Sequence, residues 1–188
     1  MNEDTIYMLK NGGTGILLTD TIYGLVGSAM SAEVVKKICD LKSREEKKSL
    51  IILISSIDDL KKFGVKLTKK AEDFMKLYWP GKVSIILPFT SSKFKYLDRT
   101  GEKTLAFRMP AKDDLIAILR ETGPLVAPSA NPEGKPPAKN INEAKKYFGE
   151  EVGFYTDEGE AKSLPSTLVK IDGNKIELLR QGAVEIML

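Results

Sequence analysis

The chain of 188 residues contains no histidine and a single cysteine, Cys39. The absence of histidine excludes Ser-His-Asp and Cys-His catalysis, and it excludes any metal site built on imidazole. A single cysteine excludes an internal disulfide and suits a reducing cytosol. No apolar run approaches the roughly 18 residues of a membrane span, because the longest run, 49–55, has only the length of a strand.

The first residues show no basic segment followed by an apolar stretch, so the sequence predicts no secretory signal and no membrane association. We therefore expect a cytoplasmic protein. The length suits one domain over residues 1–188 with a sizeable core. The net charge of +3 is too small to indicate a nucleic-acid partner, and at 29% charged residues most Lys and Glu are expected on the solvated surface.

The common phosphate-binding loops are also missing. The Gly-Lys pairs at 81–82 and 134–135 lack the upstream glycine and the following Ser or Thr of a P-loop. The glycine-rich segment 12–15 precedes a predicted strand instead of following it, so we expect it to end a helix and not to bind a dinucleotide. Any phosphate chemistry must rest on Lys and Arg side chains and on backbone N–H groups.

Apolar runs and capping residues alternate along the chain in a way that predicts strands and helices in turn. Strands are expected at 14–19, 50–54, 83–87, 105–109, 125–127, 153–156, 167–171 and 176–179. Helices are expected at 4–11, 32–41, 56–63, 68–78, 112–122 and 141–148. The uninterrupted apolar run at 50–54 predicts a central strand. The fold class that follows is a single α/β domain with a mixed twisted sheet.

Two short motifs lie far apart in the chain, each directly after an apolar run. They are Thr-Asp-Thr-Ile-Tyr-Gly-Leu at 19–25 and Pro-Ser-Ala-Asn at 128–131. Both place small hydroxyl or amide residues just past a strand, where open α/β sheets bind their ligands. Further motifs are Lys-Ser-Arg at 42–44, Trp-Pro-Gly at 79–81, Phe-Arg-Met-Pro at 107–110, Ser-Thr-Leu at 166–168 and Arg-Gln-Gly at 180–182.

In order and spacing, these motifs resemble the YrdC/TsaC family, the threonylcarbamoyl-AMP synthases of tRNA modification. The resemblance runs from about Gly13 to about Gly182. It implies a sheet curved around a concave, positively charged cleft. Because the chain ends soon after the last motif, we expect the single-domain form of the family.

The resemblance implies an ATP-dependent enzyme, an L-threonylcarbamoyladenylate synthase. The family reaction joins L-threonine, bicarbonate or CO2, and ATP into threonylcarbamoyl-AMP and releases pyrophosphate. The product serves threonylcarbamoyl-adenosine formation next to the tRNA anticodon, through a separate threonylcarbamoyl-transferase complex. No metal-ligand cluster stands out, so Mg2+ is expected to arrive with ATP. Direct binding of tRNA or double-stranded RNA stays open.

The resemblance also assigns roles to individual residues. The expected catalytic residues are Lys42 and Arg44. The expected L-threonine-binding residues are Thr21, Tyr23, Arg108, Ala127 and Ser166. The expected ATP-binding residues are Arg44, Lys48, Thr104, Ser129, Asn131 and Arg180. Three positions depart from the family pattern, and they are Glu45, Ser49 and Pro137.

Two of these assignments also follow from residue chemistry, although each has an alternative. Lys42 and Arg44 lie at the end of an amphipathic helix, where the lysine ammonium and the bidentate arginine guanidinium could both contact one polyphosphate. The alternative is that they belong to a charged surface loop. Arg108 lies in an apolar strand and, by alternation, shares a face with Ala106. A buried arginine needs a carboxylate, a phosphate or water. The carboxylate of L-threonine would be such a partner. The alternatives are a salt bridge within the protein, or a sheet face that is exposed to water.

Two other functions stay open from the sequence. The cleft of an RNA-binding module would hold double-stranded RNA or tRNA and catalyse nothing. A carbamoyl-transfer role would resemble that of the related domain in hydrogenase-maturation proteins, but no acylphosphatase-like or zinc-finger region accompanies the domain here. An RNA binder has no need of a pocket at Arg108 and Ser166. With no histidine as general base, catalysis is expected to rest on holding three substrates together and neutralising phosphate charge.

Overall fold

The computed structural model describes residues 3–43 and 49–187. Its strands are β1 (Gly15–Leu18), β2 (Tyr23–Ser28), β3 (Ile51–Leu53), β4 (Val83–Pro88), β5 (Thr104–Arg108), β6 (Leu125–Val126), β7 (Phe154–Tyr155), β8 (Thr167–Asp172) and β9 (Lys175–Arg180). Its α-helices are α1 (Glu3–Lys10), α2 (Ala32–Leu41), α3 (Lys69–Tyr78), α4 (Asp113–Thr122) and α5 (Ile141–Phe148). Two 3-10 helices, η1 (Ile57–Phe63) and η2 (Ser92–Leu97), complete the described elements.

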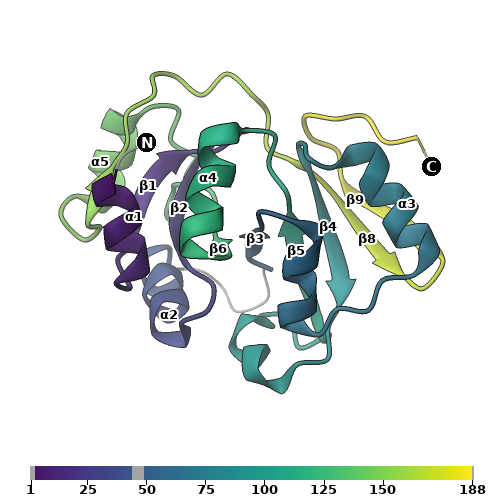
Figure 1. Ribbon diagram of the computed structural model, residues 1–188. Helices are drawn as coiled ribbons and strands as arrows, with labels where there is room; N and C mark the ends of the chain where they lie inside the picture. The colour runs from purple at the N-terminus through teal and green to yellow at the C-terminus, as the bar shows by residue number, and fades with distance from the viewer. Residues whose placement is uncertain (1–2, 44–48, 188) are drawn as a thin grey trace.

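All nine of these strands join one sheet in the order β7-β1-β2-β6-β3-β5-β4-β8-β9 (Figure 1). Three neighbouring pairs are parallel, namely β1 with β7, β3 with β5, and β4 with β8, and the remaining pairs are antiparallel. The predicted mixed α/β sheet is therefore confirmed. The apolar run that predicts a central strand forms β3, which is the fifth of the nine strands.

The sequence pattern predicts neither the strand β2 nor the 3-10 helix η2, and of the two β2 lies at the site. Its six residues, Tyr23–Ser28, include two glycines, which weaken a strand signal. Gly27 has a packing reason, because a Cβ there would lie 2.5 Å from Val34 and 2.9 Å from Ile38. The glycine lets α2 approach the sheet closely, so the residue that hides the strand from sequence analysis also permits its packing.

Local capping fixes several boundaries as expected. The Ser31 side chain accepts a hydrogen bond from the Val34 backbone N–H and begins α2. The segment 12–15 ends a helix, since Gly12 has φ +79° and the Gly13 N–H returns to the Met8 carbonyl at 2.8 Å. The expected helix over 56–63 forms as the 3-10 helix η1. These local signals depend only on neighbouring residues, which is why the sequence reveals them.

The two faces of the sheet carry different layers. On one face, α1 and α4 cover the strands through an apolar cluster comprising Leu9, Leu17, Val26, Leu53, Leu115, Leu119, Leu125 and Ala127. The other face holds the larger core, where the rings of Phe63 and Phe107 lie 5.1 Å apart. Register pairs Leu53 with Arg108 and Ile51 with Ala106. Arg108 therefore points to the face that carries α4, as the predicted alternation requires.

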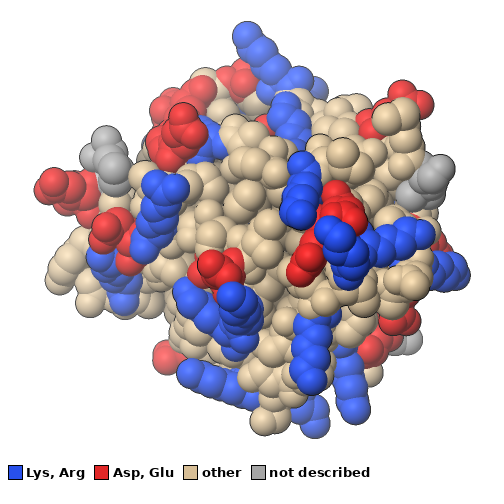
Figure 2. All heavy atoms as spheres, turned by 45° about the vertical axis from the view of Figure 1, so that its right-hand side comes forward, with Lys and Arg blue, Asp and Glu red and all other residues tan. Residues whose placement is uncertain are grey.

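The molecular surface mixes charges of both signs. Figure 2 shows acidic side chains interspersed among the lysines and arginines on the face that it presents. This mixture fits the expectation that most charged residues are solvated surface. Within residues 3–43 and 49–187, no helix is long and apolar enough to cross a membrane.

Candidate substrate cleft

A cavity of about 300 Å³ brings the two sequence motifs together. The motifs are joined by backbone hydrogen bonds from Leu25 N to the Pro128 carbonyl and from Ala130 N to the Tyr23 carbonyl, both 2.9 Å long. Gly24 and Ser129 form an isolated antiparallel bridge at the same point. Each motif thus follows its own strand, and the sheet places the two side by side.

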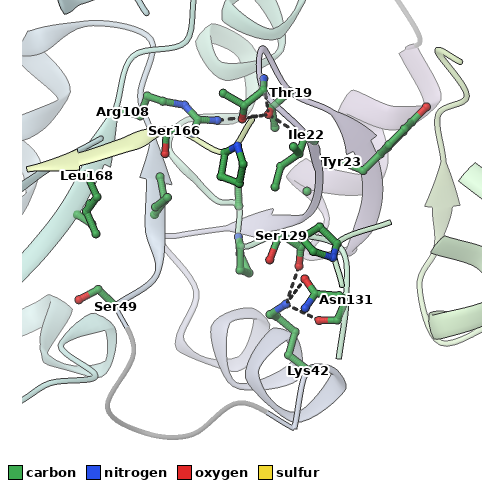
Figure 3. Close-up of a pocket in the computed structure, with 18 of the residues that line it drawn as sticks. Thr19, Ile22, Tyr23, Lys42, Ser49, Arg108, Ser129, Asn131, Ser166 and Leu168 are labelled. Atoms are coloured by element: carbon green, nitrogen blue, oxygen red, sulfur yellow. Dashed lines mark hydrogen bonds between the residues drawn. The ribbon is translucent and has the colours of Figure 1, made fainter. Parts of the chain in front are cut away.

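Nine of the residues expected in the site line this cavity (Figure 3). They are Thr21, Tyr23, Lys42, Arg108, Ala127, Ser129, Asn131, Ser166 and Arg180. Thr104 lies instead in a neighbouring depression, which shares Ser49, Leu168 and Arg180 with the cavity. Arg44 and Lys48, like the departure at Glu45, lie outside the described residues. Ser49 and Pro137, the other two departures, line the cavity.

Arg108 lines the cavity and is deeply buried, with 3% of its surface exposed. Its Nη2 lies 3.1 Å from Asp20 Oδ1 and donates to Thr19 Oγ1 at 3.3 Å. Its Nε is buried without a hydrogen-bond partner among the described residues. The salt bridge that the sequence left as an alternative is therefore present, and donor capacity still remains for a ligand.

The cavity around Arg108 is lined by more positive than negative side chains. Burial lowers the pKa of the Arg108 guanidinium, Asp20 opposes that effect, and the nearby Arg180 lowers the pKa further. An arginine remains protonated in proteins, so the cavity keeps this charge. The described lining includes three cations, Lys42, Arg108 and Arg180, against one carboxylate, Glu133. An anion is the ligand that such a lining favours.

Ser166 sits between two supporting residues. Its Oγ lies 2.9 Å from Ser84 Oγ, and both serines are buried. Arg180 donates from Nη2 to the Ser166 carbonyl at 2.8 Å, and burial lowers the pKa of Arg180. A Cβ at Gly182 would lie 2.3 Å from the Pro165 carbonyl oxygen, so glycine lets the end of the chain approach this segment. The motif at 180–182 thereby fixes Ser166.

Lys42 holds the second motif in place. It is 1% exposed, and its Nζ donates to the backbone carbonyls of Ser129, at 2.6 Å, and of Asn131. Its own carbonyl accepts from Glu133 N at 2.7 Å. The Asn131 amide donates to the Lys135 carbonyl at 2.7 Å. Figure 3 shows Lys42 directed at this turn. Its expected role in neutralising phosphate charge stays a prediction.

Tyr23 is one of the residues that line the cavity, and its hydroxyl holds another segment. The hydroxyl donates to the Gly159 carbonyl at 2.8 Å and accepts from Glu158 N at 3.1 Å. Burial raises the pKa of this phenol, and the hydrogen bond from the Glu158 backbone opposes the rise. Tyr23 therefore shapes the cavity wall and fastens residues 156–166, the connection from β7 to β8 that crosses beside the cavity and that ends in Ser166.

Sequence reasoning did not assign roles to Asp20, which stands inside the motif at 19–25, or to Ser84, which follows the motif at 79–81. Each is a polar residue whose role becomes specific only when its partner in space, Arg108 or Ser166, is known. Among the described residues, no group of three or more Cys, Asp and Glu side chains is placed to hold a metal ion. The described carboxylates therefore do not form a metal site of their own.

The Sua5/YciO/YrdC family, described as telomere recombination, matches residues 7–182. The chain belongs to this family. Family membership agrees with the resemblance carried by the motifs, and the cavity residues fall within the matched segment. The expected curvature and positive charge of the whole cleft stay predictions.

Among curated relatives, the threonylcarbamoyl-AMP synthase of Bacillus subtilis is 34% identical over 168 residues, covering 88% of this chain and 49% of the relative. A putative threonylcarbamoyl-AMP synthase of Mycobacterium tuberculosis is 29% identical, with 94% and 81% covered. The chain thus spans about half the length of the first relative and about four fifths of the second.

Solved structures of this family share the fold. Pyrococcus abyssi Sua5 complexed with L-threonine matches with a TM-score of 0.88 at 28% identity, covering 95% of this chain and 53% of that one. Escherichia coli YciO matches with a TM-score of 0.87 at 20% identity, covering 97% and 89%. The YciO comparison shows the fold alone.

Proposed function

We propose that the chain synthesises threonylcarbamoyl-AMP from L-threonine, bicarbonate or CO2, and ATP, with release of pyrophosphate. The observation that carries the proposal is the buried Arg108, which lines the cavity together with Ser166 and has no hydrogen-bond partner at Nε among the described residues. A guanidinium with free donors suits a carboxylate. The match to a relative solved with L-threonine supports this amino acid as the ligand.

The proposed arrangement divides the cavity into two ends. The amino acid binds at Arg108, Ser166, Thr21, Ala127 and Tyr23. ATP binds toward Arg180, and the further ATP-binding residues are Thr104, Ser129, Asn131, Arg44 and Lys48. The shared position of Arg180, which lines both the cavity and the neighbouring depression, supports a nucleotide that extends from one into the other.

The chemistry requires two bonds to form. The neutral amine of threonine attacks the carbon of CO2 and loses a proton, giving a carbamate. A carbamate oxygen then attacks the α-phosphorus of ATP, and pyrophosphate leaves. Mg2+ arriving with ATP would neutralise phosphate charge, together with Arg180, Lys42 and Arg44. Because the chain has no histidine, the rate enhancement comes mainly from holding the substrates in line and stabilising charge.

The proposed role extends to tRNA modification. Threonylcarbamoyl-AMP would serve threonylcarbamoyl-adenosine formation next to the anticodon, in the cytoplasm, through a separate transferase complex. Whether this chain itself touches tRNA or double-stranded RNA is decided by a binding measurement with each RNA. A role limited to RNA binding would leave the amino-acid end of the cavity unused.

A single assay tests the activity. Purified protein receives L-threonine, bicarbonate and Mg-ATP, and both pyrophosphate release and the mass of the nucleotide product are followed. We expect product only when all three substrates are present, with threonine or bicarbonate omitted in turn as controls. A protein that binds RNA but releases no pyrophosphate would contradict the proposal. Consumption of carbamoyl phosphate in place of threonine would favour the carbamoyl-transfer role instead.

A further inference from the structure

Asp20 is a buried carboxylate that faces Arg108. Its side chain is 2% exposed, and its Oδ1 lies 3.1 Å from Arg108 Nη2. Its Oδ2 accepts a hydrogen bond from Ala111 N at 3.3 Å, just beyond the strand that carries Arg108. Asp20 does not line this cavity, whereas Arg108 does. Asp20 lines a separate depression together with its neighbours Thr19 and Thr21. Its contact with Arg108 is a direct link from Asp20 to the cavity.

The contacts of Arg108 are concentrated at one of its nitrogens. Nη2 donates a hydrogen bond to Thr19 Oγ1 and forms an ion pair with Asp20 Oδ1 that lacks hydrogen-bond geometry, whereas Nε has no hydrogen-bond partner among the described residues. Figure 3 shows the guanidinium reaching toward Thr19 above Ser166. One end of the fork is therefore held by Asp20 and Thr19, while Nε carries no acceptor from the described residues.

Stability alone is a weak explanation of this pair. A buried ion pair contributes little net stability, because desolvation of both charges offsets most of their attraction. The nearby Arg180 adds a like charge, so Asp20 leaves the surroundings of Arg108 positive. The distinctive consequence of the pair is orientation. A ligand that meets donors already in place binds without the entropic cost of ordering them.

We propose that Asp20 is a positioning residue that fixes the Arg108 guanidinium before the amino acid arrives. The inference rests on the proposed function, in which Arg108 binds the carboxylate of the amino acid. Asp20 sets the affinity for that substrate without touching it. The affinity for ATP, which the proposed function places at the other end of the cavity, does not depend on Asp20.

The first test uses the native protein. Its five arginines give few Nε–H signals in a ¹⁵N correlation spectrum, and the signal of Arg108 is assigned by its loss in Arg108→Lys. We expect a sharp Arg108 signal without threonine, which shifts as L-threonine is added. A signal that becomes observable only after threonine is added would overturn the proposal, because the substrate would then be what orders the guanidinium.

The second test compares two substitutions that act differently on Arg108. Asp20→Ala removes the anchor, and Asp20→Glu keeps the charge but displaces the carboxylate by one methylene. We expect each to weaken L-threonine binding about three- to tenfold in calorimetry and to leave ATP affinity within about twofold. Threonine affinity that stays within about twofold in both variants would overturn the proposal.

A matched control separates positioning from general loss of structure. Asp59 is also a buried, paired carboxylate, 6% exposed, with its Oδ1 2.6 Å from Lys62 Nζ, and it does not line the cavity. We expect Asp59→Ala to lower the unfolding midpoint while both affinities stay unchanged. If Asp20→Ala weakens threonine and ATP equally, it acts through folding alone and the proposal fails.

Arg108→Ala distinguishes failure of this inference from failure of the proposed function. If Arg108→Ala leaves threonine affinity unchanged, the assignment of Arg108 is wrong and the proposal for Asp20 falls with it. If Arg108→Ala weakens threonine and the Asp20 variants do not, only the positioning role is wrong. In the double variant, Asp20→Ala should add nothing to the loss caused by Arg108→Ala, because both changes remove the same contact.

Discussion

Arg108 and Lys42 are both cations buried in the same cavity, yet their surroundings differ. Arg108 meets a carboxylate and a hydroxyl through one nitrogen and leaves Nε without a partner. Lys42 directs its ammonium to the backbone carbonyls of Ser129 and Asn131. Two side chains of the same charge therefore have different contacts in the cavity, Arg108 with side chains and Lys42 with the backbone of the turn at 129–131.

The comparison shows that the burial of a cation does not by itself indicate that the cation binds a ligand. Lys42 is the more deeply buried of the two, at 1% exposure against 3% for Arg108. The two residues differ in the acceptors that they contact, which are backbone carbonyls for Lys42 and side-chain oxygens for Arg108. Lys42 meets backbone carbonyls, whereas Arg108 meets a carboxylate and a hydroxyl and keeps a donor, Nε, without a partner among the described residues.

Lys42→Met should produce the largest effect on stability. The change keeps the length of the side chain and removes charge-assisted hydrogen bonds to two carbonyls, so we expect the free energy of unfolding to fall by about 3 kcal/mol. Urea denaturation measures it, with Lys36→Met as the control, because Lys36 is exposed on the same helix. A stability equal to that of the native protein would show that Lys42 is not a brace.

Arg108→Ala should produce the largest effect on binding. Loss of a charge-assisted hydrogen bond, typically worth roughly 1.5–3 kcal/mol, should reduce L-threonine affinity by about one to two orders of magnitude. Calorimetry should find ATP affinity little changed in the absence of threonine. Arg120→Ala, at an exposed arginine of α4, is the matched control and should alter neither affinity. Equal losses for both ligands would refute the division of the cavity into two ends.

Substrate choice sharpens the comparison at the Arg108 end. Thr21 and Ser166 place small hydroxyl groups at this end of the cavity. L-serine lacks one methyl group, worth roughly 1 kcal/mol of apolar contact, and should bind about five- to tenfold more weakly than L-threonine. Calorimetry with L-valine provides the contrast, since a site that reads the hydroxyl should reject it. Valine bound as tightly as threonine would argue against such a site.

The smallest expected effect concerns Ser84, which lies behind Ser166. Ser84→Val and Ser84→Thr add similar volume, but only threonine keeps the hydroxyl that faces Ser166 Oγ at 2.9 Å. One neutral hydrogen bond contributes about 1 kcal/mol, so the valine variant should bind L-threonine about two- to fivefold more weakly than the threonine variant. Identical affinities for these two variants would show that the Ser84 hydroxyl does not orient Ser166.

The sequence reveals most of the fold because its signals are local. The Ser31 cap, the apolar run that becomes β3 and the alternation that aims Arg108 depend only on near neighbours. It does not reveal β2, because Gly27 is explained by α2 packing against the strand, which is a contact in space. Motif resemblance brings nine expected residues to one cavity. It cannot predict the partners that fix them, since the contact between Arg108 and Thr19 joins positions 89 residues apart.

The order of strands has a consequence for how the site is made during synthesis of the chain. Thr19 follows β1, whereas Arg180 closes β9, and β9 reaches the sheet only through β8 and β4. A growing chain therefore carries its first motif long before it carries the serine and arginine that complete the cavity. Sheets with such distant pairings fold slowly. A nascent chain that lacks β9 would hold Arg108 and Asp20 but would still lack Arg180, which lines the cavity and donates to the Ser166 carbonyl.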